Sequence, residues 1–226
     1  IELNEKGQVV KINYEEDGEI TGEITFEYGD FSRSTKFNAV MRYRNWYEGD
    51  FDIYLQLDEH GFVTYALEIN LPERPEDRHR DWEFEYNSDG QMTRMRIYTH
   101  DDDGDEFRIN YKNGDITNVA EIIAGETEYN YIINYTNSKF SEPVPNKGGI
   151  MLLDEAFEIY ITEMEPAYWA GMLGKATKNL PMGITYDYDD YEEYYWEFNS
   201  NQLPIKFYDS KECLEDNRPD VVFHWR

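Results

Sequence analysis

The chain has 226 residues, with 48 acidic and 21 basic side chains and a formal net charge of −27. Nucleic acids and anionic membranes attract proteins through Lys and Arg, so this charge argues against both as partners. Cations, cationic proteins and neutral ligands such as glycans remain possible binding partners. A simpler interpretation of the charge is that it keeps a β-rich protein soluble.

Cys213 is the single cysteine, which excludes an intramolecular disulfide and a metal site built from several cysteines. No apolar run approaches the ~20 residues that a transmembrane helix needs. The chain begins inside a repeat, at Ile1, without an initiator methionine. We therefore interpret it as a mature fragment from which a targeting signal has been removed.

Segments in which apolar and polar residues alternate recur along the chain, separated by short turns rich in Gly, Asn and Asp. This pattern predicts strands with one buried face, joined as hairpins. In the stretch 82–98, for example, Trp82 and Phe84 alternate with glutamates and Gly90 supplies the turn. The predicted strands and hairpins up to residue 135 are, in chain order, 1–14, 20–28, 39–47, 51–69, 82–98, 107–119 and 129–135.

The period of the pattern changes after Gly149. Apolar residues from Leu152 to Met164 recur at helical spacing, which predicts an amphipathic helix. Pro166 predicts the start of a second, short helix over 167–173. Strands are again predicted at 184–188, at 193–208, where Asn201 stands in place of the turn glycine, and at 221–225.

Together these elements predict one domain over residues 1–226, mainly β and α+β by count. A sheet of about ten twisted strands must curl or close. We therefore expect a curved antiparallel sheet, or a partly open, barrel-like meander. A helical insertion at about 152–178 would pack its apolar face on the sheet.

The acidic run from Asp101 to Glu106 has two interpretations. Clustered carboxylates suit calcium, with Asp101, Asp103 and Asp105 as the candidate ligands. The spacing of glycine and glutamate does not match a calcium-binding EF-hand loop, so a turn between strands is the alternative. Calcium is the one cofactor that the sequence suggests.

Aromatic and acidic residues alternate between Tyr186 and Trp196. Aromatic rings stack on sugar faces and carboxylates accept hydrogen bonds from sugar hydroxyls, so this composition suits a glycan site. A half-buried strand uses the same residues, which is the structural alternative. The candidate ligand-binding residues are Trp46, Tyr47, Tyr186, Tyr188, Tyr191, Tyr194 and Trp196.

No catalytic residue is predicted. The sequence lacks a Gly-x-Ser-x-Gly elbow, a phosphate-binding loop and a dinucleotide fingerprint. Its four histidines are scattered without the paired spacing of a zinc site. Paired carboxylates could hydrolyse glycosides, but the separation that matters is spatial.

The strand-turn units resemble the tyrosine-aspartate hairpin repeats of bacterial surface and secreted proteins. The stretch Tyr168 to Pro181, with its Gly-Lys-x-x-Lys-Asn-Leu-Pro sequence, further resembles a family of predicted lipoproteins and secreted domains of unknown function from gut Bacteroidales. That family is described as having a porin-like sheet. The resemblance implies export and an envelope location as a lipoprotein, with a lipid anchor upstream of Ile1. It supplies no catalytic residues.

The leading hypothesis is a non-enzymatic, envelope-associated or secreted β domain that binds an extracellular ligand such as a glycan. The alternative is a structural or assembly component that docks another envelope protein. A third hypothesis is a hydrolase that uses two of the many carboxylates.

Overall fold

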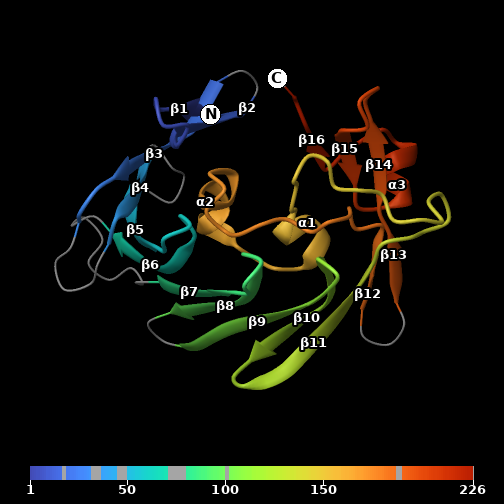
Figure 1. Ribbon diagram of the computed structural model, residues 1–226, viewed down its shortest axis with the longest axis horizontal. Coiled ribbons are helices and arrows are strands. Elements are labelled where there is room, and N and C mark those ends of the chain that lie inside the picture. The colour runs from blue at the N-terminus through green and yellow to red at the C-terminus, as the bar shows by residue number, and fades with distance from the viewer. Residues whose placement is uncertain are drawn as a thin grey trace. The chain divides into compact units, whose positions relative to one another are not determined.

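The computed structural model describes residues 1–16, 19–31, 37–44, 50–70, 80–99, 102–186 and 190–225. Strands dominate it and the helices are short, as Figure 1 shows. The strands are β1 (Glu2–Leu3), β2 (Val9–Glu16), β3 (Glu19–Tyr28), β4 (Ala39–Arg44), β5 (Phe51–Leu57), β6 (Val63–Asn70), β7 (Arg80–Tyr86), β8 (Met92–Thr99), β9 (Asp102–Lys112), β10 (Asp115–Ile123), β11 (Glu126–Asn134), β12 (Gly183–Thr185), β13 (Tyr191–Glu193), β14 (Tyr195–Phe198), β15 (Pro204–Tyr208) and β16 (Val221–Val222). The helices are α1 (Leu153–Phe157), the 3₁₀ helix η1 (Thr162–Met164), α2 (Glu165–Trp169) and α3 (Lys211–Glu215).

Strands β1 to β13 form one sheet in chain order, and β14 to β16 form a second sheet. Neighbours are antiparallel, as where Ile24 of β3 lies opposite Tyr43 of β4. The prediction of a mainly β fold built on an antiparallel meander is therefore confirmed. The predicted ranges miss most of β13, which has three residues and is too short to show alternation in the sequence.

The chain divides into two compact units. Unit 1 consists of Ile1–Tyr86, Arg94–Glu106 and Thr162–Gly174, and unit 2 of Asn87–Thr93, Phe107–Ile161 and Lys175–Arg226. Each unit thus combines strands with part of the helical segment. The single domain over residues 1–226 stays a prediction.

One turn geometry recurs at four hairpins, which begin at Asn4, Asp58, Asn87 and Asn199. In each, the side-chain oxygen of the first residue accepts hydrogen bonds from the backbone N–H groups two and four residues later. The fourth residue adopts a left-handed φ, and it is Gly7, Gly61, Gly90 or Gln202. The prediction that Asn201 replaces the turn glycine is therefore wrong by one position, since Gln202 does so with a φ of 61°.

Buried carboxylates of unit 1 are paired with arginines. Asp52, Glu68 and Glu106 are 5%, 4% and 6% exposed. An unpaired charge at such a position costs several kcal/mol, so removal of one partner would destabilise the fold. Arg42 and Arg44 pair with Asp52, Arg80 pairs with Glu68, and Arg94 and Arg96 pair with Glu106.

The helical segment of unit 1 is held against strands by buried polar contacts. Tyr14 of β2 donates a hydrogen bond to Glu165 at 2.9 Å, and Tyr43 of β4 donates one to the carbonyl of Glu163. Arg80 at the start of β7 pairs with the carboxylate of Glu163 at 2.6 Å. These contacts fix η1 and α2 on the strands of unit 1 (Figure 1).

The predicted helix from Leu152 to Met164 is wrong. α1 spans only Leu153–Phe157 and ends where Glu158 adopts a left-handed φ of 53°. Ile159 and Ile161 are nevertheless buried, at 0% and 3% exposure. The spacing of the apolar residues therefore predicts correctly that the segment is buried, but it does not predict its backbone conformation. The second helix exists as α2, with Pro166 in its first turn as predicted, but it ends at Trp169 and not at residue 173.

The distinctive Gly-Lys-x-x-Lys-Asn-Leu-Pro stretch crosses two hairpin turns of unit 2. The backbone N–H of Lys175 donates to the carbonyl of Gly90, and that of Lys178 donates to Gly114. Asn179 donates through its backbone and its side chain to the carboxylate of Asp115, at 2.8 and 2.7 Å. The stretch therefore has a structural role in unit 2.

The acidic run belongs to a strand from Asp102 onward, because β9 begins there. Gly104 has a φ of 74°, and a Cβ at this position would lie 1.6 Å from the carbonyl oxygen of Ile97 in β8. The alternative of a turn is therefore wrong for residues 102–106. The glycine is required by the close approach of β8 and not by a calcium loop.

Candidate functional site

A pocket of about 280 Å³ lies within unit 2. Three parts of the chain form it: α1 and the residues after it, the strand pair β12 and β13 with Tyr194, and the ends of β15 and β16. Its wall, as far as the described residues form it, consists of carboxylates and tyrosines, without a lysine or arginine. The lining residues are Asp154, Glu155, Glu158, Tyr160, Tyr186, Glu192, Tyr194, Asp209 and Asp220.

Glu158 organises one side of the pocket. Tyr160 donates a hydrogen bond to its Oε2 at 2.6 Å, and Tyr186 donates one to its Oε1 at 2.9 Å. Tyr186 also packs edge-on against Tyr131, with 5.7 Å between the ring centroids. The left-handed φ of Glu158 costs of order 1–3 kcal/mol for a non-glycine residue. The fold accepts this cost at a residue that lines the pocket.

Tyr194 is the most buried lining residue, with 1% of its surface exposed. Its hydroxyl has no hydrogen-bond partner, and neither has the buried Oδ1 of Asp209. A buried hydroxyl or carboxylate oxygen without a partner costs about 1–3 kcal/mol, so such atoms are normally satisfied. The pocket therefore offers a ligand two unpaired atoms. The hydroxyl of Tyr194 can donate and accept a hydrogen bond, and Oδ1 of Asp209 can accept one.

Burial, together with nearby carboxylates, raises the pKa of two tyrosines that line the pocket. Burial raises the pKa of Tyr186 well above its ordinary value, and the hydrogen bond to Glu158 and its charge raise it further. The pKa of Tyr194 is raised by burial and then by the charges of Glu158, Glu192 and Asp209. The hydroxyls stay protonated, so they remain hydrogen-bond donors.

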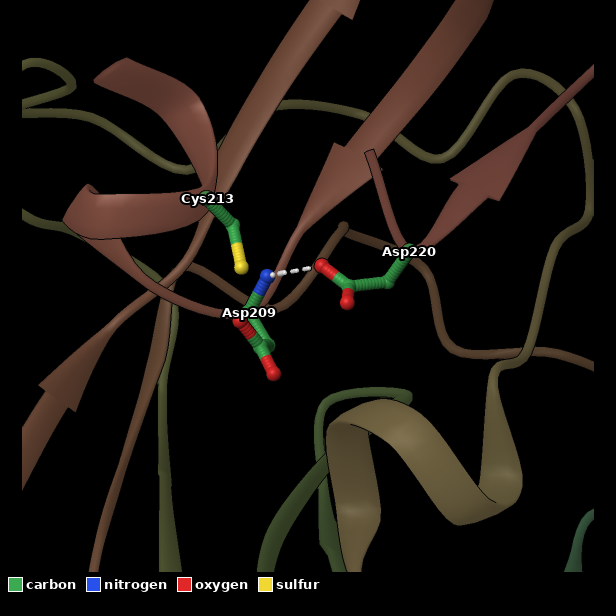
Figure 2. A group of neighbouring side chains, drawn as sticks. All are labelled: Asp209, Cys213 and Asp220. Atoms are coloured by element: carbon green, nitrogen blue, oxygen red, sulfur yellow. Dashed lines mark hydrogen bonds between the residues drawn. The ribbon is translucent and has the colours of Figure 1, made fainter. Parts of the chain in front are cut away.

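Three possible metal ligands meet at one edge of the pocket. Asp209, Cys213 and Asp220 each bring one possible ligand atom within 4.8 Å of the other two. Figure 2 shows these three side chains. Ser210 caps α3 by accepting a hydrogen bond from the backbone N–H of Cys213, which fixes the start of that helix. The backbone N–H of Asp209 donates to Asp220 at 2.9 Å. Two carboxylates and a thiol are a donor set for a divalent ion.

Two of the predicted ligand-binding residues, Tyr186 and Tyr194, line this pocket. Tyr191 is 45% exposed and lies over Gly183, where an added Cβ would meet its ring at 2.8 Å. Trp196 is 1% exposed and donates a hydrogen bond to the carbonyl of Pro181, so its ring is a core residue and not a surface platform for a sugar. The structure thus separates the aromatic run into pocket, surface and core.

Trp46, Tyr47, Tyr188 and Asp101 lie outside the described residues. Asp103 and Asp105 lie in β9. The side chain of Asp103 is also outside the description, and that of Asp105 is half-buried. Calcium binding by the acidic run stays a prediction.

Sequence reasoning missed most of the pocket. The carboxylates of Asp154, Glu158, Asp209 and Asp220 carried no distinguishing signal among 48 acidic residues. They meet only because unit 2 brings α1 beside the ends of β12, β15 and β16. The residues that could be found were those in the compositionally unusual run 186–196.

The fold and the site define the class of protein: a mainly antiparallel β domain with an acidic, tyrosine-lined pocket. Residues 1–206 match the family described as a domain of unknown function with porin-like fold (DUF4595), and the chain belongs to this family. The predicted resemblance to a family of unknown function with a porin-like sheet is thereby confirmed.

A solved structure of similar fold is that of a porin-like protein from Bacteroides uniformis ATCC 8492. The two chains are 16% identical, with a TM-score of 0.66 over 91% of this chain and 78% of the other. At this identity the likeness shows the fold alone. No curated protein matches the chain. None of the helices in the described ranges is long and apolar enough to cross a membrane.

Proposed function

We propose that the chain is a non-enzymatic, exported domain of the cell envelope that binds one sugar ring of an extracellular glycan in the pocket of unit 2. The observation that carries this proposal is the buried hydroxyl of Tyr194, which lines the pocket without a hydrogen-bond partner. A ligand that supplies the missing partner removes the cost of this group.

Sugar hydroxyls match the unused atoms of the pocket. A hydroxyl both donates and accepts, so it can donate to Oδ1 of Asp209 and accept from Tyr194. The tyrosine rings of Tyr160 and Tyr186 add apolar faces of the kind on which sugar rings stack. Their hydroxyls are already held by Glu158, so the rings are oriented before a ligand arrives.

The size and charge of the pocket narrow the ligand. Its volume of about 280 Å³ lies near the lower end of ligand pockets, which favours one ring over an oligosaccharide. Its carboxylates disfavour phosphates, sulfates and other anions. An envelope location is supported by the family and by a similar fold in a Bacteroides porin-like protein.

A glycoside hydrolase is the second candidate, because one specific observation favours it. Carboxylate oxygens of Asp209 and Asp220 lie within 4.8 Å of each other and both residues line the pocket. Retaining glycosidases place two carboxyl groups about 5–5.5 Å apart. Release of reducing sugar that is lost in Asp220→Asn would establish this candidate and overturn the non-enzymatic proposal.

The test of the proposal is a thermal-shift screen of mono- and polysaccharides, followed by calorimetric titration of the sugars that stabilise the protein. Binding should weaken about tenfold in Tyr194→Phe, which removes one hydrogen bond to the ligand. Tyr195→Phe is the matched control, because its hydroxyl donates to Glu193 and does not line the pocket. Equal affinity of both variants contradicts the proposed site. Binding of no sugar, together with a dimer or a captured envelope protein, would favour the assembly alternative.

A further inference from the structure

Among the described residues, four carboxylates of the pocket lack the arginine partners that the buried carboxylates of unit 1 have. In unit 1, each of the buried residues Asp52, Glu68 and Glu106 has an arginine partner. In unit 2, the ion pairs between described residues use Glu197, Glu212, Glu215 and Asp216. Within that part of the chain, no such pair includes Glu158, Glu192, Asp209 or Asp220 of the pocket. Four carboxylates therefore share a small volume without a cationic side chain.

Hydrogen bonds compensate these four carboxylates only in part. Glu158 accepts from Tyr160 and Tyr186, and Glu192 shares the donor of Tyr186 at 3.2 Å. Asp220 accepts from a backbone N–H, whereas Oδ1 of Asp209 is buried and accepts from nothing. Neutral donors satisfy lone pairs but leave the net negative charge in place.

A positively charged group in the ligand would remove this imbalance. A protonated primary amine offers three hydrogen-bond donors and one charge, in a volume comparable with that of a hydroxyl. It can donate to Oδ1 of Asp209 and to neighbouring carboxylates while accepting nothing, and charge-assisted hydrogen bonds are about twice as strong as neutral ones.

We infer that the pocket selects a sugar that carries a protonated primary amine, with Asp209 as a principal acceptor of the ammonium group. This inference rests on the proposed function, since it names the class of sugar that the same pocket takes. The ring hydroxyls of such a sugar supply the partner for Tyr194, and the amine supplies the charge.

The test compares matched sugars by calorimetric titration at neutral pH and low salt. Glucosamine, galactosamine and mannosamine are each paired with their N-acetyl derivative, which keeps the ring and loses the charge. The amine should bind about tenfold tighter or better, because its hydrogen bonds are charge-assisted. Its advantage should shrink with added salt and as pH rises through the pKa of the amine.

Two variants test whether the preference for amino over N-acetyl sugars arises in the pocket. Asp209→Asn keeps the shape of the side chain and removes its charge, and it should lower the preference for amine over N-acetyl sugar about tenfold. Asp216→Asn is the matched control, because it removes one aspartate charge at the end of α3, outside the pocket. Equal loss in both variants would mean a diffuse effect of net charge and would overturn the assignment.

The remaining outcomes separate this inference from the function on which it rests. Equal affinity for amino and N-acetyl sugars overturns the inference and leaves glycan binding standing. Binding of no sugar overturns both. Binding of calcium or zinc ions alone, lost in Asp209→Asn, would mean that a metal at Asp209, Cys213 and Asp220 compensates the charge, and it also overturns the inference.

Discussion

At Gly104, strands β8 and β9 lie too close together to leave room for a side chain. An alanine there would place its Cβ 1.6 Å from the carbonyl oxygen and 2.7 Å from the carbonyl carbon of Ile97. Both atoms belong to the backbone of β8, so no side-chain rotation relieves the overlap. Strands β8 and β9 would have to separate by more than an ångström near this point.

The cost of Gly104→Ala has two parts. The left-handed backbone, with a φ of 74°, costs about 1–2 kcal/mol for an alanine. Separation of the strands weakens one or two ladder hydrogen bonds, each with a net value of about 0.5–1.5 kcal/mol. We therefore expect Gly104→Ala to lower the free energy of unfolding by about 1.5–5 kcal/mol.

Gly7→Ala is the matched control in the same unit. Gly7 has almost the same φ, 76°, but a Cβ there would meet nothing within 4 Å. Only the backbone cost remains, about 1–2 kcal/mol. Urea unfolding, followed by tryptophan fluorescence and by amide exchange in β8 and β9, measures both losses. Equal losses in the two variants would refute the close pairing of β8 and β9 at Gly104.

Three further predictions follow from single residues. Gln202→Gly should raise the free energy of unfolding by about 0.5–1 kcal/mol in urea unfolding, because glycine adopts the left-handed turn without strain; an unchanged or lower value contradicts the turn. Tyr194→Phe should stabilise the ligand-free protein by about 1 kcal/mol, because it removes a buried hydroxyl without a partner; a calorimetric loss of stability would mean that the hydroxyl is bonded. The contribution of Tyr28 to stability should be constant below pH about 9 and fall above pH about 10, the tyrosine pKa in the unfolded chain. Burial raises the pKa of Tyr28 to about 12, so the folded protein keeps a proton that the unfolded chain has lost, and the contribution disappears as pH rises toward 12. Unfolding midpoints measured across this range should fall less in Tyr28→Phe, and a flat profile for the native chain would contradict the burial.

The hairpins could be predicted because their turns are encoded locally. Asn4, Asp58 and Asn87 each accept hydrogen bonds from residues two and four positions later, so the turn needs only a short stretch of sequence. The turn between β10 and β11 lies outside the predicted strands and has two left-handed residues, Gly125 with a φ of 82° and Ala124 with a φ of 51°. Alanine carries no turn signature.

The pocket could be predicted only where its composition was unusual. Tyr186 and Tyr194 stood out in a run of tyrosines and acids, and both line it. Trp196 belonged to the same run but faces the core, since alternation along β14 turns its ring inward. Asp209 and Glu158 join the pocket from segments far apart in the chain. Their meeting depends on the packing of unit 2, which no local pattern encodes.

The proposed amino-sugar site in unit 2 is the pocket lined by Tyr194 and Asp209. The most direct measurement is an NMR titration of the isotope-labelled chain with glucosamine. We expect chemical-shift changes to concentrate at the residues that line the pocket and to vanish in a double variant, Tyr194→Phe with Asp209→Asn. Changes centred on other residues, or retained in the double variant, would contradict this site.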